Sequence, residues 1–227
     1  MSENFLSNLG GISTQESFIT VALPKGKLFN LSAELLQKIG WTAEGLHEKS
    51  RKLVITNEEA RLKFIITKTA DVPTYVEHGA ADIGIIGKDV IVESEKNVYE
   101  LLDLGFGKCH LMMAVPKDKK RASLEDYAHT RVATKFPRIA ENFFVSRGMQ
   151  MEYIKLNGSI ELGPIVGLSE SIVDIVETGT TLKENNLEEI VSIMDSTARL
   201  IANRVSYKLK YQRIDKLVAD LKKILIS

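Results

Sequence analysis

Residues 172–182 read Ile-Val-Asp-Ile-Val-Glu-Thr-Gly-Thr-Thr-Leu, and the rest of the chain is organised around them. The β-branched run predicts a buried strand that carries Asp174 inside it and Glu177 at its end. The small residues 178–181 then form a turn into a predicted helix. Such a turn presents unpaired backbone N–H groups together with hydroxyls, which are the donors that bind phosphate. Gly179 lets the main chain approach an anion closely or take a positive φ.

The two acids of this stretch indicate what else the ligand carries. Asp174 and Glu177 repel phosphate, but they can bind ribose hydroxyls or act through Mg²⁺. The stretch therefore predicts a ligand with a phosphate at one end and sugar hydroxyls beside it. An ordinary strand–turn–helix connection with a threonine N-cap accounts for the same residues, so the short motif alone is a hypothesis.

The composition is that of a globular protein. The 227 residues suffice for one large domain or two small ones, with 44% hydrophobic and 26% charged residues. The 30 basic residues balance the 30 acidic ones, so no nucleic-acid footprint is indicated. The single Cys109 excludes an intramolecular disulfide framework and fits a reducing compartment; we expect it to be a small buried hydrophobe. No stretch approaches the ~20 apolar residues of a membrane span.

The beginning of the chain differs from the rest. Residues 1–17 lack the basic region and the apolar core of a signal peptide, and we expect a flexible leader. From there the hydrophobic pattern predicts strands at 18–23, 51–56, 61–67, 82–86, 109–115, 131–134, 152–156, 172–177 and 189–194. It predicts helices at 28–39, 71–79, 138–147, 160–168, 196–206 and 208–226, with Asp71 as an N-cap and Gly40 and Gly148 closing helices.

The alternation of strands and helices predicts an α/β fold with mostly parallel sheets. Ligands of such sheets bind at the carboxyl ends of strands. The loops that follow predicted strands are 24–27, 68–71, 87–89, 134–138, 157–161 and 177–181. Because these loops are spread along the whole chain, a site between two lobes would gather them.

Four segments resemble the ATP phosphoribosyltransferase family, which performs the first step of histidine biosynthesis. The longest is 161–182, Glu-Leu-Gly-Pro-Ile-Val-Gly-Leu-Ser-Glu-Ser-Ile-Val-Asp-Ile-Val-Glu-Thr-Gly-Thr-Thr-Leu. The others are Pro-Lys-Gly-Lys-Leu at 24–28, Ser-Arg-Lys-Leu at 50–53 and Ala-Asp-Val-Pro-Thr-Tyr-Val-Glu-His-Gly-Ala-Ala-Asp-Ile-Gly at 70–84. They occur in the order of the family over about residues 18–208, and four segments together are far more specific than one loop.

The resemblance implies a fold and an assembly. The fold would be similar to that of type II periplasmic-binding proteins, with two α/β lobes and a cleft. Residues 18–108 and 195–227 would form lobe I, and 109–194 would form lobe II with the phosphate loop. Because the chain ends at Ser227, it resembles the short form of the family. That form is cytoplasmic and works as a homodimer within a hetero-oligomer, beside a regulatory subunit similar to histidyl-tRNA synthetase.

The implied reaction joins N1 of the adenine of ATP to C1 of phosphoribosyl pyrophosphate (PRPP) and releases pyrophosphate, with substrate-bound Mg²⁺ as cofactor. A ring nitrogen that attacks an anomeric carbon needs no protein nucleophile. Negative charge grows on the departing pyrophosphate, so cations directed at it supply ~3 kcal/mol per good donor. Orientation of the two large anions supplies the rest.

Most candidate residues take their roles from their positions in the resembling segments, and Lys88 and Lys135 from their positions directly after predicted strands. Lys27 and Arg51 are expected to stabilise pyrophosphate as catalytic residues. The family usually has Arg where this chain has Lys27, and a lysine offers a point charge rather than a bidentate fork. PRPP is expected to bind Asp174, Glu177, Thr178, Gly179, Thr180 and Thr181, and ATP to bind Gly26, Asp71, Lys88, Lys135 and Glu161. The alternative for Lys27, Arg51 and Lys135 is that each is a solvated surface cation without a role in catalysis or binding. The alternative for Asp71 is that it serves only as a helix N-cap.

Other classes of protein fit the sequence less well. The four histidines show no metal-ligand spacing, so no protein metal site is expected. A type I phosphoribosyltransferase has adjacent acids before its Thr-Gly turn, whereas Asp174 and Glu177 are three apart. A solute-binding protein of the same fold would need export. A sugar-phosphate-binding regulatory domain would need a DNA-reading module.

Overall fold

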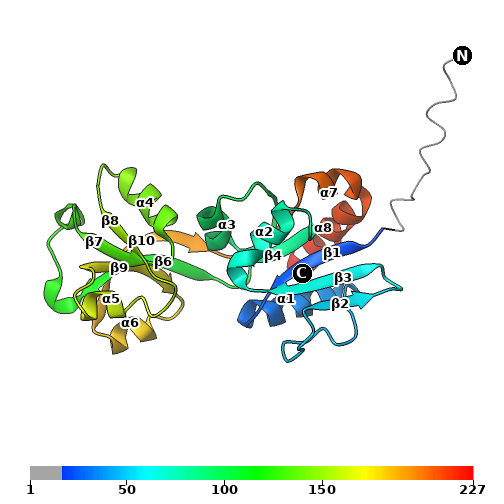
Figure 1. The fold of residues 1–227 in the computed structure, drawn as a ribbon, viewed down its shortest axis with the longest axis horizontal. Coiled ribbons are helices and arrows are strands. Elements are labelled where there is room, and N and C mark those ends of the chain that lie inside the picture. The colour runs from blue at the N-terminus through cyan, green and yellow to red at the C-terminus, as the bar shows by residue number, and fades with distance from the viewer. Residues whose placement is uncertain (1–16, 227) are drawn as a thin grey trace, which may run out of the picture. The chain divides into compact units, whose positions relative to one another are not determined.

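The computed structural model describes residues 17–226, so the expected leader at 1–17 lies outside the described residues except for Ser17. The chain forms two compact units (Figure 1). Of the described residues, unit 1 comprises 17–86, Lys96–Leu104 and 199–226, and unit 2 comprises Gly87–Glu95 and Gly105–Ala198. These bounds differ from the expected lobes chiefly at Gly87–Glu95, which the family resemblance implied to be part of lobe I.

Unit 1 is built on a six-stranded mixed sheet in the order β2-β3-β1-β4-β11-β5. Its strand β1 runs parallel to β3 and β4, whereas β2 pairs antiparallel with β3 as the expected hairpin, and β11 pairs antiparallel with β5. The strands are β1 (Ile19–Pro24), β2 (Val54–Asn57), β3 (Leu62–Thr67), β4 (Ile83–Gly87), β5 (Tyr99–Asp103) and β11 (Ala198–Ala202). The expectation of mostly parallel sheets is therefore wrong, since antiparallel partners flank the parallel centre.

The helices of unit 1 are α1 (Lys27–Lys38), the 3-10 turn η1 (Thr69–Asp71), α2 (Val72–Glu77), α7 (Arg204–Leu209) and α8 (Tyr211–Ile226). The amphipathic α8 buries Ile214, Leu217 and Leu221, as its helical spacing predicts. Asp71 precedes α2, but no capping hydrogen bond from its side chain is present within residues 17–226. The predicted N-cap position of Asp71 and the proline in the first turn of α2 are confirmed, whereas the Asp71 side chain makes no capping hydrogen bond to the described residues.

One predicted helix is also wrong. Residues 196–206 form the end of a strand, then β11, and only then the start of α7. Alanine, leucine and arginine favour a helix locally. In the fold, however, β11 lies between β4 and β5, and Ala198, Leu200, Ile201 and Ala202 are completely buried. Pairing on both edges of the strand overrides the local preference.

Asp82, just before β4, attaches the C-terminal helices to the sheet of unit 1. Its side chain is almost fully buried and accepts the Thr20 N–H at 2.7 Å. The ammonium group of Lys210 donates to both carboxylate oxygens at 2.8 Å, and to the Phe18 carbonyl at 2.7 Å. We call this group, Asp82 with Lys210, Thr20 and Phe18, the Asp82 cluster.

Two further side chains hold the same helices. Asn203 caps α7 by accepting the N–H groups of Val205 and Ser206, while its amide donates to the carbonyl of Val76 at 2.9 Å. Arg213 of α8 donates to the carbonyls of Ser17 and Ala60. Residues 199–226 are thus an integral part of unit 1.

Unit 2 contains a five-stranded mixed sheet in the order β10-β6-β9-β7-β8. Here β7 runs parallel to β8 and β9, and β6 runs antiparallel to β9 and β10. The strands are β6 (Cys109–Pro116), β7 (Arg131–Thr134), β8 (Glu152–Lys155), β9 (Ser171–Val176) and β10 (Leu187–Ser196). The helices are α3 (Lys88–Ser94), α4 (Pro137–Val145), α5 (Leu162–Ile165) and α6 (Thr180–Glu184), with 3-10 turns η2 (Lys117–Lys119) and η3 (Glu125–Tyr127).

Two apolar clusters cover opposite faces of this sheet. Neighbouring residues of a strand point to opposite faces, and Ile172 belongs to one cluster whereas Val173 belongs to the other. The first cluster contains Leu182 of α6 and Leu187 of β10, and the second contains the phenylalanines of α4. Figure 1 shows α4 and α6 on opposite sides of this sheet. Cys109 is a free cysteine and is buried, as predicted. Asp174 is two residues after Ile172 and therefore lies on the face covered by α6.

Candidate functional site

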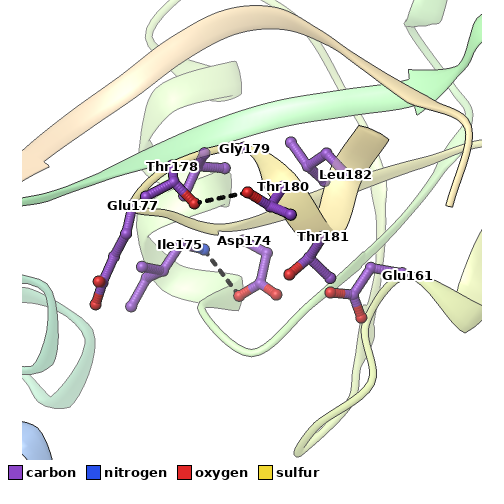
Figure 2. Close-up of a pocket in the computed structure, with 10 residues that line it drawn as sticks. Glu161, Asp174, Ile175, Glu177, Thr178, Gly179, Thr180, Thr181 and Leu182 are labelled. Atoms are coloured by element: carbon purple, nitrogen blue, oxygen red, sulfur yellow. Dashed lines mark hydrogen bonds between the residues drawn. The ribbon is translucent and has the colours of Figure 1, made fainter. Parts of the chain in front are cut away.

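A pocket of about 350 Å³ lies where β9 leads into α6 (Figure 2). All the predicted PRPP residues line it, together with the predicted ATP residue Glu161. The complete lining is Glu161, Asp174, Ile175, Val176, Glu177, Thr178, Gly179, Thr180, Thr181 and Leu182. We call residues 177–179 the β9–α6 loop. The structure thus gathers residues that the sequence analysis grouped by their order along the chain alone.

The conformation of the β9–α6 loop explains its small residues. Gly179 is the N-cap residue of α6 and has φ +74°, a left-handed conformation that favours glycine. The hydroxyls of Thr178 and Thr180 lie 3.1 Å apart and are joined by a hydrogen bond in Figure 2. Both threonines are exposed, so two hydroxyls and the first N–H groups of α6 are available to an oxyanion.

Asp174 is the half-buried acid of the pocket. Its Oδ1 accepts the N–H of Ile175 at 2.8 Å. Burial raises the pKa of the Asp174 carboxyl, and the negative charge of Glu161 raises it further, while Lys135 lowers it. Figure 2 shows the carboxyl groups of Asp174 and Glu161 on the same side of the loop, near Thr181. The ionised form of Asp174 is therefore held at a cost, which cationic or hydroxyl groups of a ligand would offset.

The remaining predicted residues divide between the two units. Lys135 follows β7 in unit 2, and its charge acts on Asp174. Lys88 begins α3, also in unit 2. Gly26, Lys27, Arg51 and Asp71 lie in unit 1.

Those four residues of unit 1 are brought to one edge of its sheet. Pro24 at the end of β1 is level with Thr67 at the end of β3, and the Lys25 N–H donates to the Thr67 carbonyl at 2.9 Å. The Leu53 carbonyl accepts the Ile66 N–H, so the chain that enters β2 reaches the same edge. Lys27 thus follows the carboxyl end of β1, and Arg51 precedes β2 where β2 pairs with the carboxyl end of β3.

Some residues at the pocket were missed by the sequence analysis. Ile175, Val176 and Leu182 supply its apolar lining, and an apolar strand run alone gives no sign of that role. Glu189 of β10 lies against Gly179: a Cβ built at this glycine would be 3.2 Å from Glu189 Oε1. It comes from a separate strand, and only the register of β10 could have indicated its place.

A second pocket, of about 390 Å³, lies in unit 1 beside α8. Its lining includes Trp41, Arg61, Arg213 and Lys216. Arg213 already donates to the carbonyls of Ser17, Ala60 and Arg61, which assigns it a structural role. Among residues 17–226 no helix is long and apolar enough to cross a membrane, and no group of three or more His, Cys, Asp or Glu side chains is arranged to hold a metal ion.

Comparison with known proteins gives one consistent result. The family described as HisG: ATP phosphoribosyltransferase matches residues 68–223. A relative from Desulfitobacterium hafniense (strain Y51), named ATP phosphoribosyltransferase, is 53% identical over 216 residues, covering 92% of this chain and 97% of its own. One of the same name from Syntrophomonas wolfei subsp. wolfei is 51% identical over 209 residues, covering 92% and 96%.

Solved structures extend the comparison to the fold. The ATP phosphoribosyl transferase (HisG:HisZ) complex from Thermotoga maritima has a chain 33% identical, with a TM-score of 0.79, covering 92% of this chain and 98% of its own. The substrate binding protein of an amino acid ABC transporter has a TM-score of 0.59 at 13% identity, covering 91% and 94%. The second likeness concerns the fold alone, and it confirms the two-lobed type II periplasmic-binding-protein architecture.

Proposed function

The chain belongs to the ATP phosphoribosyltransferase family, and from this premise we propose how its own residues bind PRPP and ATP. The activity is the first step of histidine biosynthesis, in which N1 of the adenine of ATP attacks C1 of PRPP and pyrophosphate leaves. The β9–α6 loop and the start of α6 bind the 5′-phosphate of PRPP. The observation that carries this assignment is the pocket itself, where hydroxyls, a left-handed glycine and two acids converge.

The acids of the pocket fit the ribose side of PRPP. Phosphate binds the N–H groups and hydroxyls of Thr178, Gly179, Thr180 and Thr181. Asp174 and Glu177 then accept the ribose hydroxyls. Asp174 and Glu161 also fit a divalent cation carried by the substrate, because burial and the nearby charge of Glu161 raise the pKa of Asp174 and a cation would offset that cost. Mg²⁺ bound in this way would neutralise the negative charge that develops on pyrophosphate.

Lys27 and Arg51 take the leaving-group role in the proposal. Both are exposed at the edge of the unit 1 sheet where the strands β1 and β3 end. A cation near the departing pyrophosphate stabilises the transition state more than the ground state, because the charge grows during bond cleavage. Gly26, Asp71, Lys88, Lys135 and Glu161 are assigned to ATP. The single buried Cys109 accords with a cytoplasmic location.

One experiment separates this function from its alternatives. The purified chain is mixed with ATP, PRPP and Mg²⁺, and the absorbance of the N1-substituted adenine is followed, with omission of PRPP as the control. A type I phosphoribosyltransferase would leave ATP unchanged, and a solute-binding protein would bind a ligand without turnover. Absence of the new absorbance, both alone and with a regulatory subunit, would reject the proposed activity.

We propose in addition that the chain is controlled by a partner. The Thermotoga maritima structure is a HisG:HisZ complex, which supports a second, regulatory subunit for this chain. In the proposal that subunit is similar to histidyl-tRNA synthetase and assembles with a homodimer of this chain. Within residues 17–226 each segment is accounted for by one of the two units, so sensing of histidine is assigned to the other subunit. Turnover is measured against histidine concentration with and without the partner. Strong inhibition of the isolated chain, non-competitive with both substrates, would reject this division of roles.

A further inference from the structure

Glu189 of β10 lies against the β9–α6 loop, outside the set of side chains that line the pocket. A Cβ built at Gly179 would be 3.2 Å from Glu189 Oε1 and 4.0 Å from a methyl group of Val176. The carboxylate therefore lies close to the backbone of the residue that turns the chain into α6. No role in phosphate binding follows for it from the motif of residues 172–182.

The fold determines why Glu189 faces this loop. Helix α6 packs against β10. Leu187, two residues before Glu189, belongs to the apolar cluster that contains Leu182 of α6. Residues two apart on a strand point to the same face, so Glu189 points toward α6.

A β-bulge limits this face to the first part of β10. The register of β10 with β6 shifts between Glu189 and Val191, so Ile190 is the extra residue. Ile190 and Val191 both pack against the cluster on the other face of the sheet. Glu189 is consequently the final side chain of β10 before the bulge to point toward α6.

We propose that the carboxylate of Glu189 opposes the 5′-phosphate of PRPP and keeps the affinity of the β9–α6 loop for phosphate low. The inference rests on the proposed function of the β9–α6 loop. The N–H groups at the start of α6 attract both the Glu189 carboxylate and the 5′-phosphate of PRPP. The carboxylate and the doubly charged phosphate would lie on two sides of one stretch of backbone, where repulsion is only partly screened.

This arrangement has a use in turnover. The product, phosphoribosyl-ATP, retains the 5′-phosphate of PRPP, so the same loop holds substrate and product. Tight binding of both would slow product release without accelerating the chemical step. A carboxylate behind the loop weakens both complexes in proportion and lets the product leave.

The test is the variant Glu189→Gln, which removes the charge and keeps the shape of the side chain. Titration calorimetry with PRPP and, separately, with inorganic phosphate is performed at low and at high salt. We expect Glu189→Gln to bind PRPP about five- to tenfold more tightly at low salt, and the difference to shrink at high salt because screening weakens the repulsion. The exposure of Glu189 keeps the expected change modest.

Glu188→Gln is the matched control. It removes the same charge one residue away, on the opposite face of the strand, where Glu188 pairs with Lys120. We expect its PRPP affinity to stay within about twofold of the parent chain, because Lys120 already balances the charge.

The outcomes separate this inference from the assignment of the loop. Tighter PRPP binding by Glu189→Gln alone supports it. Equal or weaker PRPP binding by Glu189→Gln, in a parent chain that does bind PRPP, overturns it and makes the carboxylate a support of the loop. Failure of the parent chain to bind either PRPP or phosphate overturns the assignment of the loop itself, and the inference with it.

Discussion

Asp82 in unit 1 and Asp174 in unit 2 are both shielded from water, but Asp82 is paired with a cation whereas Asp174 lies in the ligand pocket. Asp82 accepts hydrogen bonds from the Thr20 N–H and from the Lys210 ammonium. Asp174 accepts one from the Ile175 N–H and has the acid Glu161 as a neighbour, so its pKa is raised by burial and by that charge. The comparison teaches that a paired acid stabilises the fold, whereas an acid kept ready for a ligand stores unfavourable energy.

The largest effect is expected from breaking the paired acid. Lys210→Met leaves Asp82 buried without its cation, and we expect the free energy of unfolding to fall by roughly 2–3 kcal/mol, because an uncompensated charge remains. Chemical denaturation measures the change. Lys208→Met, an exposed lysine of α7, is the control and is expected to change stability by less than about 0.5 kcal/mol. If the two variants unfolded at the same denaturant concentration, the Asp82 cluster would not contribute to stability as proposed.

The next effect concerns the ligand side of the comparison. Thr180→Val removes a pocket hydroxyl while it keeps volume and β-branching. We expect PRPP affinity to fall at least about tenfold, since loss of a hydrogen bond to a charged group costs roughly 1.5–3 kcal/mol. Calorimetry with PRPP measures the affinity, and Thr74→Val at an exposed position of α2 is the control. Unchanged PRPP binding by a folded Thr180→Val protein would remove the phosphate assignment.

Asp174→Asn removes the charge of the pocket acid and, unlike Lys210→Met, is expected to raise stability. Asparagine can still accept the Ile175 N–H, but it carries no charge. We expect the variant to be more stable than the parent at neutral pH, by about 0.5–1 kcal/mol, and to lose activity at least about tenfold. Denaturation and turnover at pH 7 measure both. Parallel loss of stability and activity would contradict the interpretation of Asp174 as an acid held at a cost.

The pH dependence of this variant follows from the sign of the shift. Burial raises the pKa of Asp174 in the folded chain, so the folded state binds the proton more tightly than the unfolded state. Its contribution to stability therefore decreases as the pH rises from the ordinary aspartate pKa through the raised one. The free energy of unfolding of Asp174→Asn relative to the parent should therefore increase over this pH range and stay constant above the raised pKa of Asp174.

The smallest effect is expected at Glu170, whose pKa is lowered in the folded chain, whereas the pKa of Asp174 is raised. Its hydrogen bonds from Arg131, one of them 2.7 Å long, lower the pKa of Glu170. Its stabilisation is therefore present above the ordinary glutamate pKa and is lost as the pH falls through the lowered value. The pair is partly exposed, so Glu170→Gln should cost only roughly 0.5–1 kcal/mol at neutral pH. A cost that grows toward acidic pH in denaturation experiments would contradict this.

The pocket of unit 2 could be predicted because its chemistry is contiguous in the sequence. Strand, turn and helix start follow each other over residues 172–182, and the structure folds them into one pocket. The left-handed Gly179 also follows from the turn, since a residue without Cβ suits that position. The sequence pattern was therefore sufficient to predict the pocket residues that are neighbours along the chain.

Other features depend on pairings between distant residues. The strand β11 looks helical by propensity and becomes a strand only because β4 and β5 leave a place between them. The helix α3 and the strand β5 were not predicted, because residues 88–103 carry a weak pattern among charged side chains. Glu189 reaches Gly179 through the packing of α6 against β10, which depends on the register with β6.

The four passages of the chain between the units also order the events of synthesis. Unit 2 ends at Ala198, whereas unit 1 awaits residues up to the last helix. While the chain is still being made, β5 has no neighbour until β11 emerges, and Asp82 has no cation until Lys210 emerges. The unit with the ligand pocket can therefore fold on the ribosome first, and the sheet of the other unit is completed by residues that are synthesised after those of unit 2.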